Sequence, residues 1–355
     1  MNVTDPSAPI TRSESPLVVE FPFAESGDRV TPNYQFFIRH HFPVPEVDPS
    51  SWPLRVEGAM DTPFSMSLDT LRALPAVTVS AVIECAGNGR AFIEGFDSSV
   101  QWQLGGVGCA TWTGVPLRTV LAKARVHASA VDVVFEGADH GPEDKLPGAA
   151  DIHFARSVPL AIAMRPDVVL AYEMNGQPLE PDHGAPLRVI VPGWYGVTSV
   201  KWLSRIIISS STFTGFFQSA EYTYWRRSGA SGIERVPVAT LQVKSEIARP
   251  YEGEEVAVGV PYRVFGAAWT SGASIVSVDV SVDGGRAWSP ATLGATADRH
   301  AWQQWEFEWT PLAAGRCTLM ARTTDSEGRV QPMAHDPNHE SYMVHHVLPI
   351  AVRVT

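Results

Sequence analysis

From about residue 238 onward, short stretches of alternating apolar and polar residues are separated by turns that contain Gly and Pro. This spacing is typical of an antiparallel β-sandwich of about 100 residues. A chain of 355 residues is also too long for one ordinary core. We therefore predict a division near residue 238, with a sandwich domain at 238–355. Its expected strands are 241–247, 262–268, 275–282, 302–309 and 317–325.

The part of the chain before residue 238 mixes patterns of both kinds. Residues 77–84 are rich in Val and Ile and predict a buried strand, whereas 117–124 predict a helix after a Gly-Val-Pro turn. The sequence therefore predicts a mixed α/β domain at 31–237 and an α+β class for the whole chain. Residues 1–30 are polar and rich in Pro and Ser, and we expect an arm that is flexible or lies along the surface. Other expected elements are strands at 52–58, 64–67, 132–136 and 187–191 and a short helix that begins at 68.

Charge and composition limit the classes of partner. The formal net charge is −11, which argues against a nucleic-acid partner. No stretch approaches 18 apolar residues, so we expect no membrane partner. The N-terminus lacks a cationic start followed by an apolar run, which predicts a cytoplasmic location, or a periplasmic one if a leader has been removed. The three cysteines are far apart, so they predict no disulfide framework, and the absence of a Cys-x-x-Cys-His run predicts no haem in this chain.

Cys85 directly follows the predicted strand 77–84 and opens the loop Cys-Ala-Gly-Asn-Gly-Arg. Gly87 and Gly89 would let the backbone approach a bulky ligand closely. The positive charge of Arg90 favours the thiolate form of the cysteine. A soft thiolate suits either a transition metal or nucleophilic catalysis. The alternative is a buried cysteine that acts only as a small apolar side chain.

Two further segments combine polar donors with glycine. Residues 182–188 read Asp-His-Gly-Ala-Pro-Leu-Arg, and residues 193–202 read Gly-Trp-Tyr-Gly-Val-Thr-Ser-Val-Lys-Trp. Cationic groups beside glycine loops are what an anionic group on a ligand requires. Taken singly, each segment could equally be an ordinary loop with exposed charges.

Together these segments resemble the sulfite oxidase family over roughly residues 31–335. The matching stretches are 31–45, 84–90, 170–176, 182–188 and 200–203. Residues 279–285 and Trp288 resemble the immunoglobulin-like dimerisation domain of that family. The resemblance implies a sulfite-oxidase-type molybdopterin domain followed by an immunoglobulin-like sandwich, and a homodimer.

The resemblance also implies a role for individual residues. Cys85 resembles the thiolate ligand of a molybdenum ion that a pyranopterin dithiolene otherwise holds. Arg39 and Arg90 resemble arginines of an anion pocket, Trp102 resembles a tryptophan that lines this pocket, and Tyr222 resembles the active-site tyrosine. The residues at positions that hold the pterin and its phosphate are His41, Asp139, His183, Arg188 and Lys201.

The function that the resemblance implies is molybdenum-dependent oxidation of sulfite to sulfate. Planar guanidinium groups can hold this small oxyanion, and the electrons would pass to a separate acceptor, such as a cytochrome, or to oxygen. Two departures predict a less cationic pocket: residues 336–340 lack an arginine that vertebrate members carry, and Gly89 replaces another. The alternatives are nitrate reduction, oxidation of another sulfur compound, a non-catalytic cofactor carrier, and a sandwich protein of adhesion or interaction.

Overall fold

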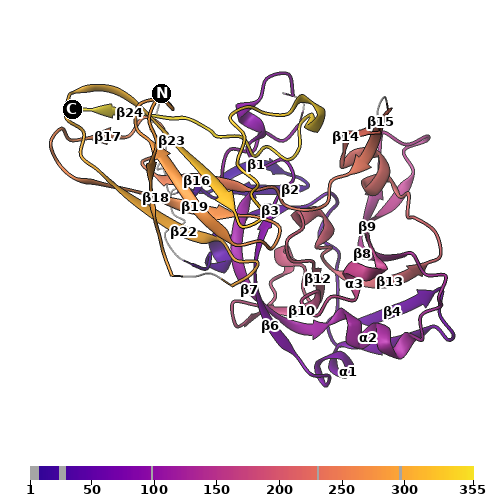
Figure 1. Ribbon diagram of the computed structural model, residues 1–355. Helices are drawn as coiled ribbons and strands as arrows, with labels where there is room; N and C mark the ends of the chain where they lie inside the picture. The colour runs from indigo at the N-terminus through magenta and orange to yellow at the C-terminus, as the bar shows by residue number, and fades with distance from the viewer. Residues whose placement is uncertain (1–7, 24–28, 97–98, 230–231, 296–297) are drawn as a thin grey trace.

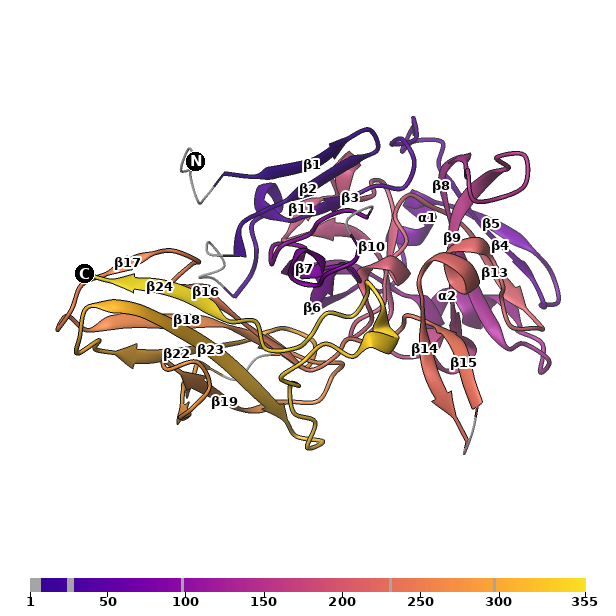
Figure 2. The same ribbon diagram turned by 90° about the horizontal axis from the view of Figure 1, so that it is seen from above.

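The computed structural model describes residues 8–23, 29–96, 99–229, 232–295 and 298–355. Figures 1 and 2 show two halves side by side: a mixed half that runs from indigo to salmon, and a β-sandwich that runs from orange to yellow. The predicted α+β class is therefore confirmed. The predicted division at residue 238 stays a prediction, and the first strand of the sandwich begins at Lys244.

A five-stranded antiparallel sheet in the first half leads to the site. Its central strands are long and almost wholly buried, because both faces of the sheet are covered by apolar side chains such as Trp112 and Leu170. The order is β11-β10-β7-β6, with β12 also paired to β10. The strands are β6 (Val77–Glu84), β7 (Val107–Pro116), β10 (Val169–Met174), β11 (Gln177–Pro178) and β12 (Arg188–Ile190).

A second five-stranded sheet has the order β5-β4-β13-β8-β9, and only its β4–β13 pair is parallel. It comprises β4 (Pro53–Gly58), β5 (Phe64–Ser67), β8 (Asp132–Pro142), β9 (Asp151–Pro159) and β13 (Leu203–Ser209). The short helices are α1 (Leu68–Arg72), α2 (Leu117–Ala124) and α3 (Leu160–Ala163). Ser67 caps the N-terminus of helix α1, because its hydroxyl accepts a hydrogen bond from the Thr70 amide at 3.1 Å.

Two small sheets complete the first half. Strands β1 (Ile10–Glu14) and β2 (Leu17–Glu20) form a hairpin that continues into β3 (Ile38–Arg39). The sequence predicts that residues 1–30 are either flexible or lie along the surface. The flexible alternative is wrong for residues 10–20, because they form the paired strands β1 and β2 and because Val18 and Glu20 are buried. Residues 1–7 and 24–28 lie outside the described part. The second hairpin, β14 (Thr223–Ser228) with β15 (Gly232–Pro237), projects away from the rest of the molecule (Figure 2).

The sandwich packs two sheets face to face. One has the order β16-β18-β22-β21 and the other β17-β24-β23-β19-β20. Apolar side chains that alternate along the strands, among them Val264, Trp305 and Leu319, form its core. The strands are β16 (Lys244–Arg249), β17 (Glu255–Val256), β18 (Tyr262–Trp269), β19 (Ile275–Ser281), β20 (Ser289–Pro290), β21 (Thr292–Leu293), β22 (Gln303–Trp309), β23 (Gly315–Asp325) and β24 (Ile350–Val354).

The two halves touch at the edge strand β6. The Val82 amide donates a hydrogen bond to the His300 carbonyl at 2.8 Å, and Met343 of the segment before β24 donates to the Ala86 carbonyl, also at 2.8 Å. Figure 2 shows this yellow segment leaving the sandwich and reaching the first half. No helix within the described ranges is long and apolar enough to cross a membrane.

Candidate active site

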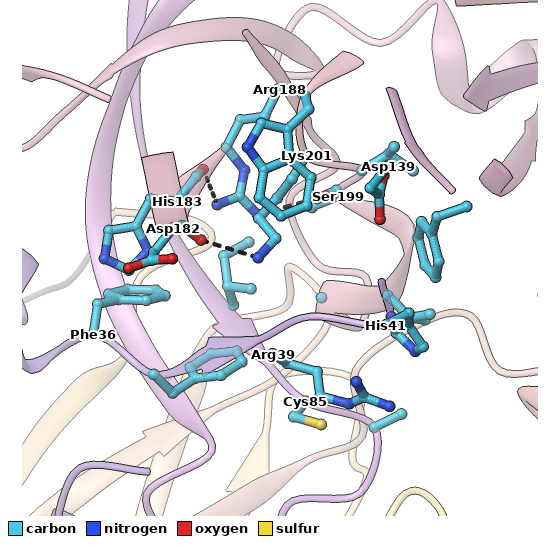
Figure 3. Close-up of a pocket in the computed structure, with 18 of the residues that line it drawn as sticks. Phe36, Arg39, His41, Cys85, Asp139, Asp182, His183, Arg188, Ser199 and Lys201 are labelled. Carbon is cyan, nitrogen blue, oxygen red and sulfur yellow. Dashed lines mark hydrogen bonds between the residues drawn. The ribbon is translucent and has the colours of Figure 1, made fainter. Parts of the chain in front are cut away.

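A cavity that is partly open to solvent, with about 690 Å³ of empty space including its mouth, lies beyond the end of β6. Phe36, Phe37 and Val200 give it apolar walls, and charged side chains stand at its two ends (Figure 3). Eight of the ten site residues predicted from the sequence line it: Arg39, His41, Cys85, Asp139, His183, Arg188, Lys201 and Tyr222. The sequence segments that carry them are therefore brought together, although they are up to 183 positions apart along the chain.

Cys85 stands at one end, on the tight loop that follows β6. The loop is held by backbone hydrogen bonds from the Cys85 amide to the Gly106 carbonyl (2.8 Å) and from the Gly89 amide to the Gln103 carbonyl (2.7 Å). Gly89 has a φ of 91°, a conformation that favours glycine. The thiol is free and buried. Burial raises its pKa, and the Gly87 amide and the charges of Arg90 and Arg39 oppose this only in part.

Arg39 lies beside the sulfur of Cys85 (Figure 3). It sits at the end of β3 and donates a hydrogen bond to the backbone carbonyl of His40. The charge of Arg39 lowers the pKa of Tyr222, although burial raises it overall, so Arg39 also acts on the tyrosine that lines this end of the cavity. A guanidinium at this position can bind a small anion next to the thiolate.

Tyr222 and His41 form a pair at the same end of the cavity. The Tyr222 hydroxyl lies 2.6 Å from His41 Nε2. Burial raises the pKa of Tyr222 to about 12 and lowers that of His41 well below its usual value. The hydroxyl therefore keeps its proton and the imidazole stays neutral at physiological pH, so that the two share one hydrogen bond between uncharged partners.

The other end of the cavity gathers His183, Arg188 and Lys201. Arg188 donates to the carbonyls of His183 (2.9 Å) and Ser199 (3.0 Å), and Lys201 Nζ donates to the carbonyl of Asp182 (2.9 Å) (Figure 3). Gly184 makes this arrangement possible: its φ is 99°, and a Cβ there would lie 2.8 Å from the Cβ of Lys201.

The charges at this end are buried and incompletely balanced. Burial lowers the pKa of Arg188 to about 9, and burial together with the charge of Arg188 lowers that of Lys201 well below its usual value. Asp139 is the nearby carboxyl, and burial raises its pKa to about 7. Arg188 Nε and Asp139 Oδ1 have no hydrogen-bond partner among the residues that the structure describes. Such groups suit an anionic ligand with several donors and acceptors.

Arg90 and Trp102 do not line the cavity, unlike the other predicted residues. Arg90 Nε donates to the Ser341 carbonyl at 3.0 Å and Nη1 to the Val100 carbonyl at 2.9 Å, and its guanidinium lies 5.2 Å from the centre of the Tyr342 ring. The expectation that Trp102 lines the pocket is not met, because its side chain is fully buried behind the cavity and packs against Phe37.

Sequence reasoning did not single out Tyr342 or the backbone carbonyl of Asp182. Tyr342 packs on Tyr222 with ring centres 5.1 Å apart, although it belongs to the segment before β24. Asp182 belongs to the charged run 182–188, but it accepts the hydrogen bond from Lys201 Nζ through its backbone carbonyl. No side-chain pattern in the sequence signals either contact.

Comparison with known proteins identifies the family. Residues 41–217 match the family described as oxidoreductase molybdopterin binding domain, and residues 235–352 match the Mo-co oxidoreductase dimerisation domain. Sulfite oxidase of Gallus gallus is 36% identical over 344 residues, which cover 90% of this chain and 72% of that protein. The chain belongs to the sulfite oxidase family.

Further proteins are similar to this chain at 26–36% identity. Mitochondrial sulfite oxidase of Homo sapiens is 36% identical, over 85% of this chain and 57% of that protein. NADH nitrate reductase of Ulva prolifera is 31% identical, over 85% of this chain and 38% of that protein. The sulfane dehydrogenase SoxCD of Paracoccus pantotrophus superposes with a TM-score of 0.81 at 26% identity, over 99% of this chain and 86% of that chain. The chain thus spans little more than half the length of its human relative.

The residues of the cavity fit a molybdopterin cofactor. The buried thiol of Cys85 is free to become a metal ligand at one end. At the other end, the cations Arg188 and Lys201 line the cavity, and Arg188 Nε has no hydrogen-bond partner among the described atoms, which suits the phosphate of the cofactor. Asp139 and His183 add groups that can hydrogen-bond a pterin ring.

Proposed function

We propose that this protein binds a molybdenum–pyranopterin cofactor through Cys85 and oxidises sulfite to sulfate. One observation carries the proposal: a free buried thiol with an adjacent arginine and a buried cationic cluster occupy opposite ends of one cavity. His41, Asp139, His183, Arg188 and Lys201 would hold the pterin and its phosphate. The cofactor supplies oxygen-atom transfer and accepts two electrons when it is bound.

The residues of the chain would bind and orient the substrate. Sulfite and one water molecule give sulfate, two protons and two electrons, so that the oxygen comes from water. Arg39 would hold the sulfite anion beside Cys85, and Tyr222 would direct its hydroxyl proton, now shared with His41, toward an oxygen of the anion. The apolar rings of Phe37 and Phe154 line the cavity and would limit the entry of water. Arg90 would act on the anion through its charge, from behind the lining.

Oxidation of a different sulfur compound is the main alternative. The similarity to a sulfane dehydrogenase favours it, as does the replacement of arginines in the family pattern by Gly89 and by residues 336–340. Nitrate reduction is supported by the 31% identity to a nitrate reductase. A non-catalytic carrier of the cofactor would bind molybdenum and turn over none of these anions.

A combined experiment tests these functions. Purified protein is analysed for molybdenum and is then assayed with sulfite, with a sulfane-sulfur compound and an oxidised dye, and with nitrate and a reduced dye. We expect about one molybdenum per chain and the highest kcat/KM with sulfite. Bound molybdenum without any turnover would support the carrier, and protein without molybdenum after expression with excess molybdate would overturn the proposal.

The electron acceptor, the location and the assembly remain proposals as well. We propose a separate acceptor, such as a cytochrome, or oxygen, for the two electrons that the oxidation of sulfite releases. A homodimer is proposed because residues 235–352 match a dimerisation domain. The cytoplasmic location expected from the sequence stays a prediction.

A further inference from the structure

A buried charged cluster lies behind the Cys85 loop, outside the lining of the cavity. Glu84, the last residue of β6, meets Lys244 and Glu246 of the sandwich strand β16. Lys244 Nζ lies 2.9 Å from Glu84 Oε1 and 2.8 Å from Glu246 Oε1. All three side chains are buried, with at most 4% of each residue exposed. Two carboxyl groups and one ammonium group thus join the two halves of the molecule.

Asn88 links this cluster to the Cys85 loop. Its Nδ2 lies 3.2 Å from Glu84 Oε1 and 3.3 Å from Glu246 Oε1, and its Oδ1 accepts a hydrogen bond from the Gly106 amide at 3.0 Å. Gly106 in turn accepts from the Cys85 amide at 2.8 Å. A continuous series of hydrogen bonds therefore runs from Glu246, through Asn88 and Gly106, to the backbone of Cys85.

The composition of the cluster is unusual for a contact that only joins two domains. Ionic groups at this depth cost desolvation energy, and apolar side chains of the same size would pack two halves together at least as well. Glu246 Oε2 has no hydrogen-bond partner within the described part of the chain, so the cluster does not satisfy all of its own groups. Trp269 Nε1 donates a hydrogen bond to Glu84 Oε2 at 2.9 Å, and the sandwich thereby also anchors the other carboxyl group that Asn88 contacts.

We propose that Glu246 is a positioning residue that orients the metal-binding loop 85–90 through Asn88. The sandwich domain is then a part of the active site as well as a scaffold for assembly. The proposal rests on the proposed function in one respect, the assignment of Cys85 as the metal ligand. Its structural content, that Glu246 holds the loop in place, does not depend on turnover.

The test compares E246A with the conservative variant E246Q and with the control E254A. In E246A, Lys244 keeps its partner Glu84, so that the fold retains a paired ammonium group. Glu254 is a matched control because it is also a buried glutamate of the sandwich domain. It accepts hydrogen bonds from Arg249 and Tyr262 and has none with the loop 85–90 among the contacts of the described residues. Amide hydrogen exchange of residues 85–90 is measured in cofactor-free protein, and kcat and KM are measured in molybdenum-loaded protein.

Loss of one hydrogen bond to a buried charged group changes an equilibrium constant or a rate constant by about tenfold. We therefore expect loop amides to exchange at least about tenfold faster in E246A, with a similar fall in kcat, an unchanged KM, and recovery in E246Q. Equal loop exchange in E246A and E254A would overturn the proposal, as would no recovery in E246Q or a loss that lies wholly in KM. Activity of the variant C85S would instead overturn the proposed function, and the exchange result would still decide the role of Glu246.

Discussion

At the scale of single residues, burial shifts the pKa values of Cys85, Tyr222 and His41 in the direction that keeps these three side chains uncharged. Burial raises the pKa of the Cys85 thiol, so the cofactor-free protein holds the protonated form at neutral pH. Metal binding must displace that proton, and the charges of Arg39 and Arg90 make this displacement easier.

We expect Cys85→Ser to abolish turnover and to leave the fold intact, because an alkoxide is a harder and poorer donor to molybdenum than a thiolate. Serine is similar in size to cysteine, and the loop is held by main-chain hydrogen bonds. Turnover and molybdenum content are measured together. Activity close to that of the unaltered protein, at equal molybdenum content, would contradict the prediction. Cys317→Ser is the control.

The two arginines of the predicted anion pocket should respond differently to substitution. Arg39 lines the cavity, so Arg39→Gln should raise the KM for sulfite about ten- to a hundredfold and change the melting temperature little. Arg90 bonds two main-chain carbonyls, so Arg90→Gln should in addition destabilise the fold by about 3 kcal/mol. Steady-state kinetics and denaturant unfolding measure the two effects. Equal stability losses in both variants would show that this distinction is wrong.

His345 should make the stability depend on pH. Burial lowers its pKa to about 4, whereas an unfolded histidine has a pKa near 6.5. Below pH 6.5 the unfolded chain therefore binds more protons than the folded one, and stability falls until about pH 4. The full effect of this residue is roughly 3 kcal/mol. Denaturant unfolding between pH 7 and 4 should show a shallower loss in His345→Gln than in the control His127→Gln, whose histidine is exposed. Identical slopes would contradict the assignment.

At the scale of elements, the N-terminal hairpin supports the site. Glu20 at the end of β2 is buried and accepts hydrogen bonds from the amides of Gly105 (2.9 Å) and Gln103 (3.1 Å). Gln103 in turn bonds Gly89 of the Cys85 loop. This hairpin is thus the second element, besides the sandwich, that braces the loop from outside.

Glu20→Ala should lower the free energy of unfolding by about 1 to 3 kcal/mol, because the buried amide of Gly105 and the part-buried amide of Gln103 lose their acceptor. Glu14→Ala, in the exposed part of the same hairpin, is the matched control. Denaturant unfolding of both variants measures the difference. The prediction fails if the two variants are equally stable.

The sequence predicts the positions of the strands better than it predicts which distant residues the strands contact. The Val- and Ile-rich run 77–84 and the alternating runs of the sandwich form strands at or near the expected positions, because side-chain periodicity reflects burial directly. The hairpin of residues 10–20 was not expected, because its polar residues carry no strong apolar alternation. The contact of Glu84 with Lys244 joins residues 160 positions apart, and no local pattern encodes such a pair. Likewise, the sequence does not encode that Phe37 lines the cavity and that Trp102 packs against Phe37 outside the lining.

At the scale of the whole molecule, one surface of the sandwich contacts the first half of the chain, and we propose a second copy of the chain as the neighbour of another surface. The surface that includes β16 faces the first half through Lys244 and Glu246. The match of residues 235–352 to a dimerisation domain suggests that another surface meets a second copy of the chain.

We expect light scattering on the intact protein to give a mass of about twice 38.6 kDa across a dilution series. Removal of the residues from 238 onward should yield a monomer or insoluble protein, because the Cys85 loop would also lose its contacts with Ser341 and Met343. A constant mass near 38.6 kDa for the intact protein would contradict the dimer and leave the sandwich as a support within one chain.

The contact between Arg90 and Ser341 has a consequence for the order of biosynthesis. The two residues are 251 positions apart, and a ribosome needs about 10 to 50 s to add that many residues. Throughout this interval the nascent loop 85–90 lacks the segment that closes it from the sandwich side. The loop therefore gains its contacts with Ser341 and Met343 only after residues 341–343 have left the ribosome, and until then only the hydrogen bonds within the first half of the chain hold it.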